Sequence, residues 1–373
     1  MSQATTGWAQ DTSLTPEYLS QIASEARSRH HLPAVAVTVM NRSGILHREI
    51  QGVRVSDRRD AVSAADYFHI GSCAKSVLSV VAATLIEQGR IAWNTRLFEV
   101  FPELHDDADP AYADVTLEHL LASRAGIKAY TNLANEPMPD IDPEANDRRY
   151  RFVRHLIRQA PAAKRKGGEF EYLYSNAGYS MAAAMLERVS GRDYETLVRS
   201  TLHDAGLAVH VGWPNLLGPD QPWGHMLSDQ GIERHGPDHP YRMPDLLMPA
   251  GDLSMTPDDY AEYTRLHLRG ARGEDNLISH TAWHHIQNAR KGFALGVYNG
   301  DLLGREYLGM DGSAGTFFCR SIIVPEADFA FTIMTNLATP TGKNEAVEWL
   351  SQRIVERRFE LGWLQRNLLR LLW

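Results

Sequence analysis

Residues 67–82 read Tyr67-Phe-His-Ile-Gly-Ser-Cys-Ala-Lys-Ser-Val-Leu-Ser-Val-Val-Ala82, and they place Ser72 and Lys75 three positions apart where a helix is expected to begin. Side chains with this spacing share one face of a helix. A serine hydroxyl is a weak nucleophile unless a base takes its proton, and a partly desolvated lysine has a pKa low enough to act as that base. The pair therefore indicates a nucleophile and its activator.

The helix that follows is expected to be buried on most sides. Its apolar residues run from Val77 to Ile86, and Gln88-Gly89 marks its end. A lysine in the first turn of a buried helix is unusual. The alternative is that Lys75 reaches solvent and Ser72 only caps the helix, since a serine three positions before a lysine also arises by chance.

The composition is that of an ordinary globular chain. Its 373 residues are 43% hydrophobic and 23% charged, enough for one large domain or two interleaved ones. The formal net charge of −8, without a dominating basic block, argues against nucleic-acid binding. Cys73 and Cys319 are too few for a disulfide framework, and the first residues lack the features of a signal peptide. We therefore expect a cytoplasmic protein with no integral membrane segment.

Strand-like patterns lie at the two ends of the chain, and helical periodicity fills the middle. Strands are expected at 34–40, 45–55, 293–298, 306–310, 316–324 and 329–335. Helices are expected at 15–31, 75–88, 147–160, 178–189, 257–269 and from about 343, with a long loop at 206–251. The expected fold is α+β, with residues 1–71 and 291–373 forming one antiparallel sheet with flanking helices. Residues 72–290 would be a mainly helical inserted subdomain, with the active site between the two parts.

A second motif supports a catalytic site. Tyr-x-Asn triplets begin at Tyr130 and Tyr174, and the second lies in a loop that feeds a helix, Gly168-Glu-Phe-Glu-Tyr-Leu-Tyr-Ser-Asn-Ala-Gly178. With Ser72 and Lys75, this segment resembles the serine β-lactamase and penicillin-binding-protein-like hydrolases, specifically the class C β-lactamase-related group that includes carboxylesterases and D-amino-acid amidases. Further landmarks fall in order at residues 115–126, 249–259 and 309–318, so the resemblance covers the chain from about 14 to 357.

The resemblance implies a β-lactamase-like fold and a role for each site residue. Ser72 would accept the acyl group, with Lys75 and Tyr174 as the base system. The backbone N–H groups of Ser72 and Ser313 would form the oxyanion hole, and Gly312 would let the substrate approach the strand. Asn176 would either donate to the substrate carbonyl or fix the lysine. The substrate- and oxyanion-binding set is Asn176, Met310, Gly312 and Ser313.

The segment 309–318 lies where the family has its third motif, whose first position is usually lysine or histidine. Here that position is Met310, which removes a positive charge that favours anionic substrates. We therefore expect a serine hydrolase of neutral esters or amides, with Arg305 or Arg320 as candidates to restore the charge. A cytosolic β-lactamase or D-aminopeptidase-type amide hydrolase is the alternative. A non-catalytic ligand-binding homologue is a second one.

No cofactor and no metal are expected, and the partner is a small-molecule ester or amide. His280 and His284 lie four positions apart on one helix face, but no carboxylate lies between them to complete a metal site. The amphipathic C-terminal residues 359–373 are expected to pack on their own domain, with a membrane-surface or dimer contact as the alternative. A homo-oligomer is left open.

Overall fold

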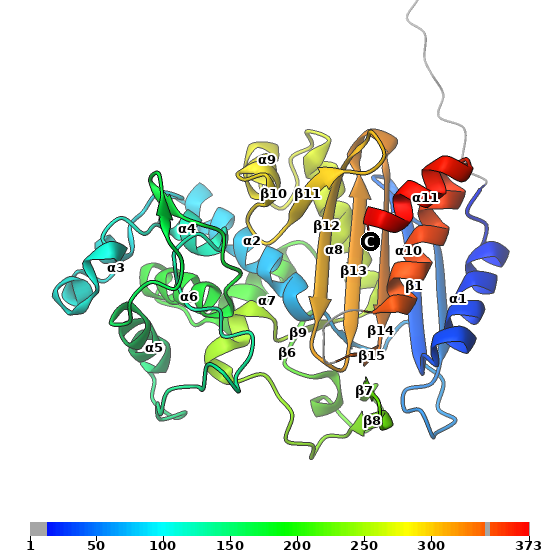
Figure 1. Ribbon diagram of the computed structural model, residues 1–373, viewed down its shortest axis with the longest axis horizontal. Coiled ribbons are helices and arrows are strands. Elements are labelled where there is room, and N and C mark those ends of the chain that lie inside the picture. The colour runs from blue at the N-terminus through cyan, green and yellow to red at the C-terminus, as the bar shows by residue number, and fades with distance from the viewer. Residues whose placement is uncertain (1–12, 340–343, 373) are drawn as a thin grey trace, which may run out of the picture.

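The computed structural model describes residues 13–339 and 344–372, and its centre is a seven-stranded sheet (Figure 1). The strand order is β10-β11-β12-β13-β14-β1-β2, and all neighbouring strands are antiparallel. The strands are β1 (Ala34–Asn41), β2 (Gly44–Gly52), β10 (Gly292–Phe293), β11 (Tyr298–Asp301), β12 (Glu306–Ser313), β13 (Phe318–Val324) and β14 (Phe329–Thr335). The predicted antiparallel sheet built from both ends of the chain is confirmed.

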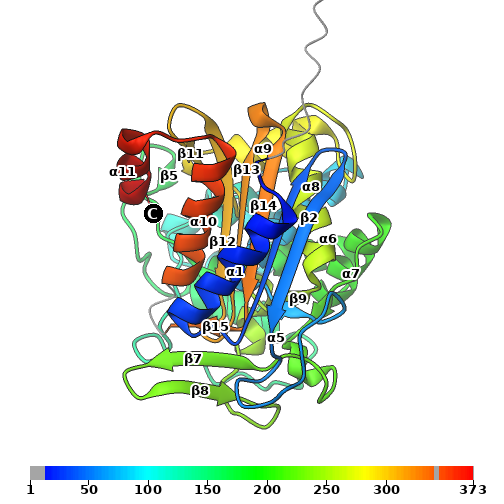
Figure 2. The ribbon, with the colours of Figure 1, turned by 90° about the vertical axis from the view of Figure 1, so that its right-hand side faces the viewer.

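Both faces of the sheet are buried, which explains the continuous apolar runs in its central strands. Alternate residues of β1 enter two different cores, with Ala36 on one face and Val37 on the other. Helices α1 (Pro16–His30) and α10 (Glu345–Arg358) cover one face (Figure 2). Helix α11 (Trp363–Leu372) buries Leu369 in the core of that same face, so the C-terminal helix packs on its own domain, as predicted.

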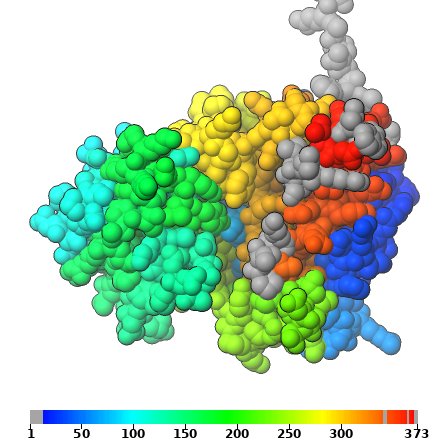
Figure 3. Space-filling view, in the orientation of Figure 1, coloured from blue at the N-terminus to red at the C-terminus, as the bar shows by residue number. Residues whose placement is uncertain are grey.

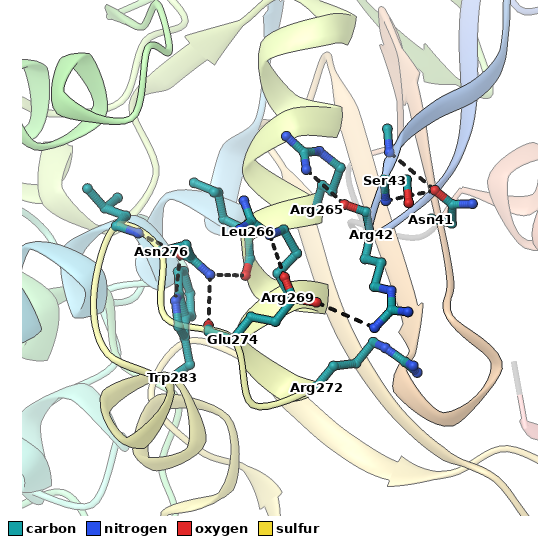
Figure 4. Close-up of polar contacts among 12 residues, drawn as sticks. Asn41, Arg42, Ser43, Arg265, Leu266, Arg269, Arg272, Glu274, Asn276 and Trp283 are labelled. Carbon is teal, nitrogen blue, oxygen red and sulfur yellow. Dashed lines mark hydrogen bonds and ion pairs between the residues drawn. The ribbon is translucent and has the colours of Figure 1, made fainter. Parts of the chain in front are cut away.

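The other face is covered by α8 (Pro257–Ala271), with α2 (Ala74–Glu87) beside it. The C-terminal end of α8 is tied to the turn between β1 and β2 (Figure 4). Arg265 Nη1 donates to the Arg42 carbonyl, and the Arg42 guanidinium lies 3.6 Å from Glu274. Glu274 in turn accepts from Arg269. A helix from the middle of the sequence is thus fixed to the sheet, while the predicted domain boundaries stay a prediction.

The remaining helices form the left-hand part of the molecule in Figure 1. They are α3 (Leu97–Val100), α4 (Leu117–Leu121), α5 (Arg148–Ile157), α6 (Asn176–Ser190), α7 (Tyr194–Asp204) and α9 (His280–Asn288). The predictions of α2, α5, α6 and α8 are confirmed, and α9 contains the i, i+4 histidines, whereas α7 lies where no helix was expected. None of the helices in the described part of the chain combines the length and apolar character needed to cross a bilayer.

Two predictions were wrong in detail, one of a strand and one of a loop. The expected strand at 293–298 is broken, because a Cβ on Gly296 would lie 2.6 Å from the Lys75 and Ser76 backbone and its φ is +79°. The 206–251 segment, expected to be a loop, contains a hairpin. The short strands are β3 (Phe68–His69), β4 (Arg165–Lys166), β5 (Glu169–Phe170), β6 (His210–Val211), β7 (Gly224–Ser228), β8 (Gly231–His235), β9 (Leu253–Met255) and β15 (Leu337–Ala338).

Candidate active site

Ser72 lies in a single 3-10 turn, Gly71–Cys73, that leads directly into α2. Two glycines let this turn lie against the end of β12. Gly71 has a φ of +51°, and a Cβ there would lie 2.8 Å from the Ser313 nitrogen. A Cβ on Gly312 would lie 1.9 Å from the Ile70 carbonyl oxygen and 2.9 Å from the Ser72 nitrogen. The backbone of Ser72 and that of Ser313 therefore meet at one place.

The Lys75 side chain is buried beneath Ser72, with 1% of its surface exposed. Its Nζ lies 3.2 Å from Ser72 Oγ, 2.8 Å from Asn176 Oδ1 and 2.7 Å from the Ala250 carbonyl oxygen. Burial lowers the pKa of Lys75 to about 7, because desolvation disfavours the ammonium ion. At neutral pH the amine is therefore divided between its charged and neutral forms, and the neutral form accepts a proton.

Tyr174 lies beside this pair, just before α6. The Lys75 Nζ is 4.6 Å from the centre of its ring. Burial raises the pKa of Tyr174 above its usual value, and a hydrogen bond with Ser72 offsets only part of that effect. Its phenol therefore stays protonated at neutral pH.

Asn176 begins α6 and uses both ends of its amide. Its Oδ1 accepts from Lys75, and its Nδ2 donates to the Tyr130 carbonyl oxygen at 3.0 Å. Of the two roles considered for Asn176, this geometry is that of a residue that fixes the lysine. Tyr130, from the other triplet, has its hydroxyl 3.4 Å from His155 Nε2, so the two triplets lie in one site with different contacts.

The third motif divides between the two faces of β12. Met310 is 1% exposed and packs in the core behind the site, so its side chain lines neither of the cavities at Ser72. Asp311, on the opposite face of the strand, forms two hydrogen bonds with Arg320, at 2.7 and 2.6 Å. β11 pairs with β12 only as far as Gly309, which leaves the edge beyond it without a strand partner among the described residues.

Two cavities meet at Ser72 and Tyr174, and the face drawn in Figure 3 is hollowed where the green helical part meets the orange strands. The larger cavity has a volume of about 690 Å³, and its walls come from residues 130–133 and 241–247, with Trp213. The smaller one, about 170 Å³, is lined by Asp311, Arg320, Asn344 and Glu348. The 206–251 segment, expected to be a long loop, therefore supplies part of the lining of the larger cavity.

The charges around the cavities differ from those considered in the sequence. Arg305 lies near Glu326 and over the ring of Phe359, and it lines neither cavity. Arg320 lines the smaller cavity but is bonded to Asp311. Among the described residues, Arg242 is a cation that lines the larger cavity, and its guanidinium lies 5.3 Å from the ring centre of Trp213.

One pair of buried residues beside Ser72 escaped the sequence analysis. His69 Nε2 lies 2.9 Å from Asp252 Oδ1, and His69 Nδ1 accepts from the Gly71 N–H at 3.0 Å. The pair therefore holds the residue just before the nucleophile, where the backbone has a positive φ. No local spacing signals a pair 183 positions apart.

Two of the histidines of α9, His280 and His285, contact separate carboxylates, and His280 is one of the i, i+4 pair considered for a metal. His280 Nδ1 lies 2.8 Å from Asp275, and His285 Nε2 lies 2.8 Å from Glu118. His285 also stacks on Trp93. These contacts are those of structural side chains on a helix.

Comparisons with known proteins agree with this architecture. A family model described as Beta-lactamase matches residues 19–355. Penicillin-binding protein 4 of Amycolatopsis lactamdurans is 24% identical over 339 residues, which cover 83% of this chain and 82% of the relative.

Two solved structures share the fold at low sequence identity. The octameric penicillin-binding protein homologue from Pyrococcus abyssi has a TM-score of 0.72 and 17% identity, over 92% of this chain and 76% of its own. The D-amino acid amidase from Ochrobactrum anthropi SV3 has a TM-score of 0.71 and 18% identity, over 92% and 96%. Because the family model spans most of the sequence, the chain belongs to the Beta-lactamase family of serine hydrolases.

Proposed function

We propose that the protein cleaves esters or amides through an acyl-enzyme on Ser72. The observation that carries the proposal is the 3.2 Å contact between Ser72 Oγ and Lys75 Nζ, at a lysine whose pKa burial lowers to about 7. A nucleophile within hydrogen-bond reach of a base that is itself oriented by a third group is the arrangement that covalent catalysis needs. Asn176 is that third group.

In the first step, neutral Lys75 takes the proton of Ser72 as Oγ bonds to the substrate carbonyl carbon. The electron pair of the carbonyl moves to its oxygen. The backbone N–H groups of Ser72 and Ser313, brought together by Gly71 and Gly312, are the proposed donors to that oxyanion.

In the second step, the bond from the carbonyl carbon to the leaving group breaks, and the leaving group takes the proton of the Tyr174 hydroxyl. The Lys75 ammonium then returns a proton to Tyr174. Water attacks the acyl-enzyme and gives a proton to Lys75, again the base. The bond from the carbonyl carbon to Ser72 Oγ then breaks, Oγ takes that proton back from the Lys75 ammonium, and the acid product leaves. The raised pKa of Tyr174 favours this acid role over a role as base in the attack.

Neutral esters are the favoured substrates. Beside Ser72, β12 and β13 supply no unpaired positive charge, because Met310 lies in the core and Arg320 is paired with Asp311. The Arg242 cation lies in the wall of the larger cavity. Esters also need less protonation of the leaving group than amides, which suits a phenol of raised pKa.

A D-aminopeptidase-type activity is the second candidate. Among the described residues of the smaller cavity, Asp311 and Glu348 outnumber Arg320 and would attract a substrate ammonium group. The cytoplasmic location and the oligomeric state remain predictions.

The test is hydrolysis of a short-chain nitrophenyl ester, an aminoacyl nitroanilide and a chromogenic cephalosporin by the wild type and by Ser72→Ala. Ser79→Ala is the matched control, since Ser79 lies on the same helix and bonds only within the core. We expect ester turnover that Ser72→Ala abolishes and Ser79→Ala keeps. If the nitroanilide is turned over faster than the ester, the D-aminopeptidase-type activity is favoured. If the cephalosporin is turned over faster, the β-lactamase alternative is favoured. No turnover, together with no labelling of Ser72 by a phosphonate, would contradict the proposal.

A further inference from the structure

A group of three metal-binding side chains lies on the β7–β8 hairpin, away from Ser72. Glu233 and His235 are two positions apart on β8, so both leave the same face of the strand. The turn after β8, in which the His239 N–H donates to the Gly236 carbonyl oxygen at 3.1 Å, brings His239 back to them. One ligand atom from each of the three side chains lies within 4.8 Å of the others.

His235 is the residue that points to a ligand. It is 2% exposed, and neither of its ring nitrogens has a hydrogen-bond partner. Its Nε2 faces an oxygen of Glu233 at 3.7 Å, which is too long for a hydrogen bond. Buried polar atoms are nearly always paired, so these two nitrogens need an explanation.

We propose that Glu233, His235 and His239 bind one divalent transition-metal ion of the zinc type. Two imidazole nitrogens and one carboxylate oxygen form a donor set that zinc accepts, with a fourth position left for water. Bonds of about 2.0–2.1 Å in a tetrahedron separate neighbouring ligand atoms by about 3.3 Å. The His239 Nε2 to Glu233 Oε1 distance is 3.2 Å, and the His235 Nε2 to Glu233 Oε2 distance is 3.7 Å.

One movement is needed to complete the site. The two imidazole rings are stacked, with centres 3.7 Å apart and planes 20° apart, so their in-plane lone pairs do not yet converge. His239 is the more exposed of the two, with 26% of its side chain accessible, and it has room to turn toward a shared ion. Glu233, with 60% of its side chain accessible, can adjust as well.

The ion would brace one wall of the larger cavity. The ring centre of Tyr241 lies 5.2 Å from that of His235, and the Arg242 Nη2 donates to the carbonyl oxygens of Gly236 and Pro237 in the turn between the ligands. Tyr241 and Arg242 both line the cavity. Metal binding at this site is independent of the chemistry proposed for Ser72, so either proposal can fail alone.

The experiment uses the full chain, stripped of metal with a chelator and titrated with Zn²⁺ by calorimetry, with Co²⁺ absorption to report the coordination geometry. We expect one equivalent of Zn²⁺ to bind, and a visible Co²⁺ spectrum of tetrahedral type. His239→Ala and Glu233→Gln should each weaken binding by more than the roughly tenfold that loss of an outer-shell partner costs.

The matched control is His280→Ala, which removes an exposed histidine that is likewise paired with a carboxylate, Asp275. It should bind Zn²⁺ as the wild type does. Circular dichroism checks that the variants are folded. The proposal is overturned if the wild type takes up no Zn²⁺, which would leave a hydrogen-bonded cluster only, or if both ligand variants bind as the wild type does, which would place the ion elsewhere.

Discussion

The larger cavity has a floor, at Ser72 and Asn176, and a wall, at Tyr241 and Arg242, and these two regions differ in how their polar groups are held. On the floor lie Ser72 and Asn176, with the buried Lys75 beneath them. Lys75 contacts three oxygens, and Asn176 uses both ends of its amide. On the wall, Tyr241 is 41% exposed, and Arg242 is held by backbone carbonyl groups and an aromatic ring. The floor is preorganised for one proton transfer, whereas the wall can change its side chains at little cost. We infer that the floor determines the reaction and the wall selects the substrate.

The largest effect should follow from Lys75→Ala. Loss of the general base should lower kcat for a nitrophenyl ester by about 10³-fold, within the range that general-base catalysis supplies. Lys128→Ala, which removes a lysine outside the cavities, should retain wild-type kcat. If Lys75→Ala kept most of its activity, the separation between floor and wall would not hold.

Tyr174→Phe should have the next largest effect, and its size should depend on the leaving group. With a nitrophenolate, which leaves without a proton, kcat should fall about tenfold. With an alkyl ester the loss should approach about 10³-fold, because an alkoxide needs the proton that Tyr174 supplies. Equal losses for the two substrates, measured as a kcat ratio, would argue that Tyr174 is not the acid.

The pH profile should report the buried amine directly. Because the pKa of Lys75 is lowered to about 7 and the neutral form is the base, kcat/KM should rise with pH through 7 and level off above 8. Below pH 7 it should fall about tenfold for each unit, as the neutral fraction does. A rate that is flat between pH 6 and 8 would assign the base role to another group.

A smaller effect is expected from His69, which supports the floor without being placed in the reaction. His69→Leu removes the acceptor for the Gly71 N–H and should lower kcat about tenfold with little change in KM, as a misplaced nucleophile turn would. His69→Asn keeps an acceptor near the position of Nδ1 and should recover most of the rate. Equal rates in the two variants would show that the hydrogen bond does not position the turn.

The smallest effect should come from the wall. Arg242→Gln should raise KM a few-fold for a nitrophenyl ester with an anionic acyl chain and leave kcat unchanged, since a partly exposed charge adds about 1 kcal/mol or less. A neutral ester of the same length is the control substrate. A drop in kcat for both esters would indicate that the wall takes part in the chemistry after all.

The parts of the fold that could be predicted are those in which the local pattern and the tertiary environment agree. The fully buried, largely apolar strands β13 and β14 and the buried helix α2 have this property. Ser72 and Lys75 were recognisable because one helical turn relates them. Tyr174 was chosen over Tyr130 because its triplet lies in a loop that feeds a helix and resembles the family's segment. The structure brings these three residues together.

The rest depended on contacts between distant segments. The break at Gly296 is imposed by the start of α2, more than 200 residues earlier, and the glycine itself was the signal in residues 293–298 that was missed. The side chain of Met310 turns into the core because of the register of β12 against β13, which the sequence does not specify. The β7–β8 hairpin was not predicted because many Gly and Pro residues surround it, which favoured a loop. The Glu-x-His spacing on β8 is the sequence signal for the proposed metal site, and it was overlooked.

The position of β1 has implications for how the protein is made. It is synthesised before every other strand of the sheet, yet it pairs with β14, as Val35 does with Thr335, 300 positions later. Until β14 emerges, the β1–β2 hairpin presents an unpaired apolar edge, and pairings of such high contact order form slowly. The strand that carries Ser313 arrives equally late. A nascent chain therefore holds a complete Ser72–Lys75 helix long before it has a working oxyanion hole, and premature termination would yield an inert, aggregation-prone product.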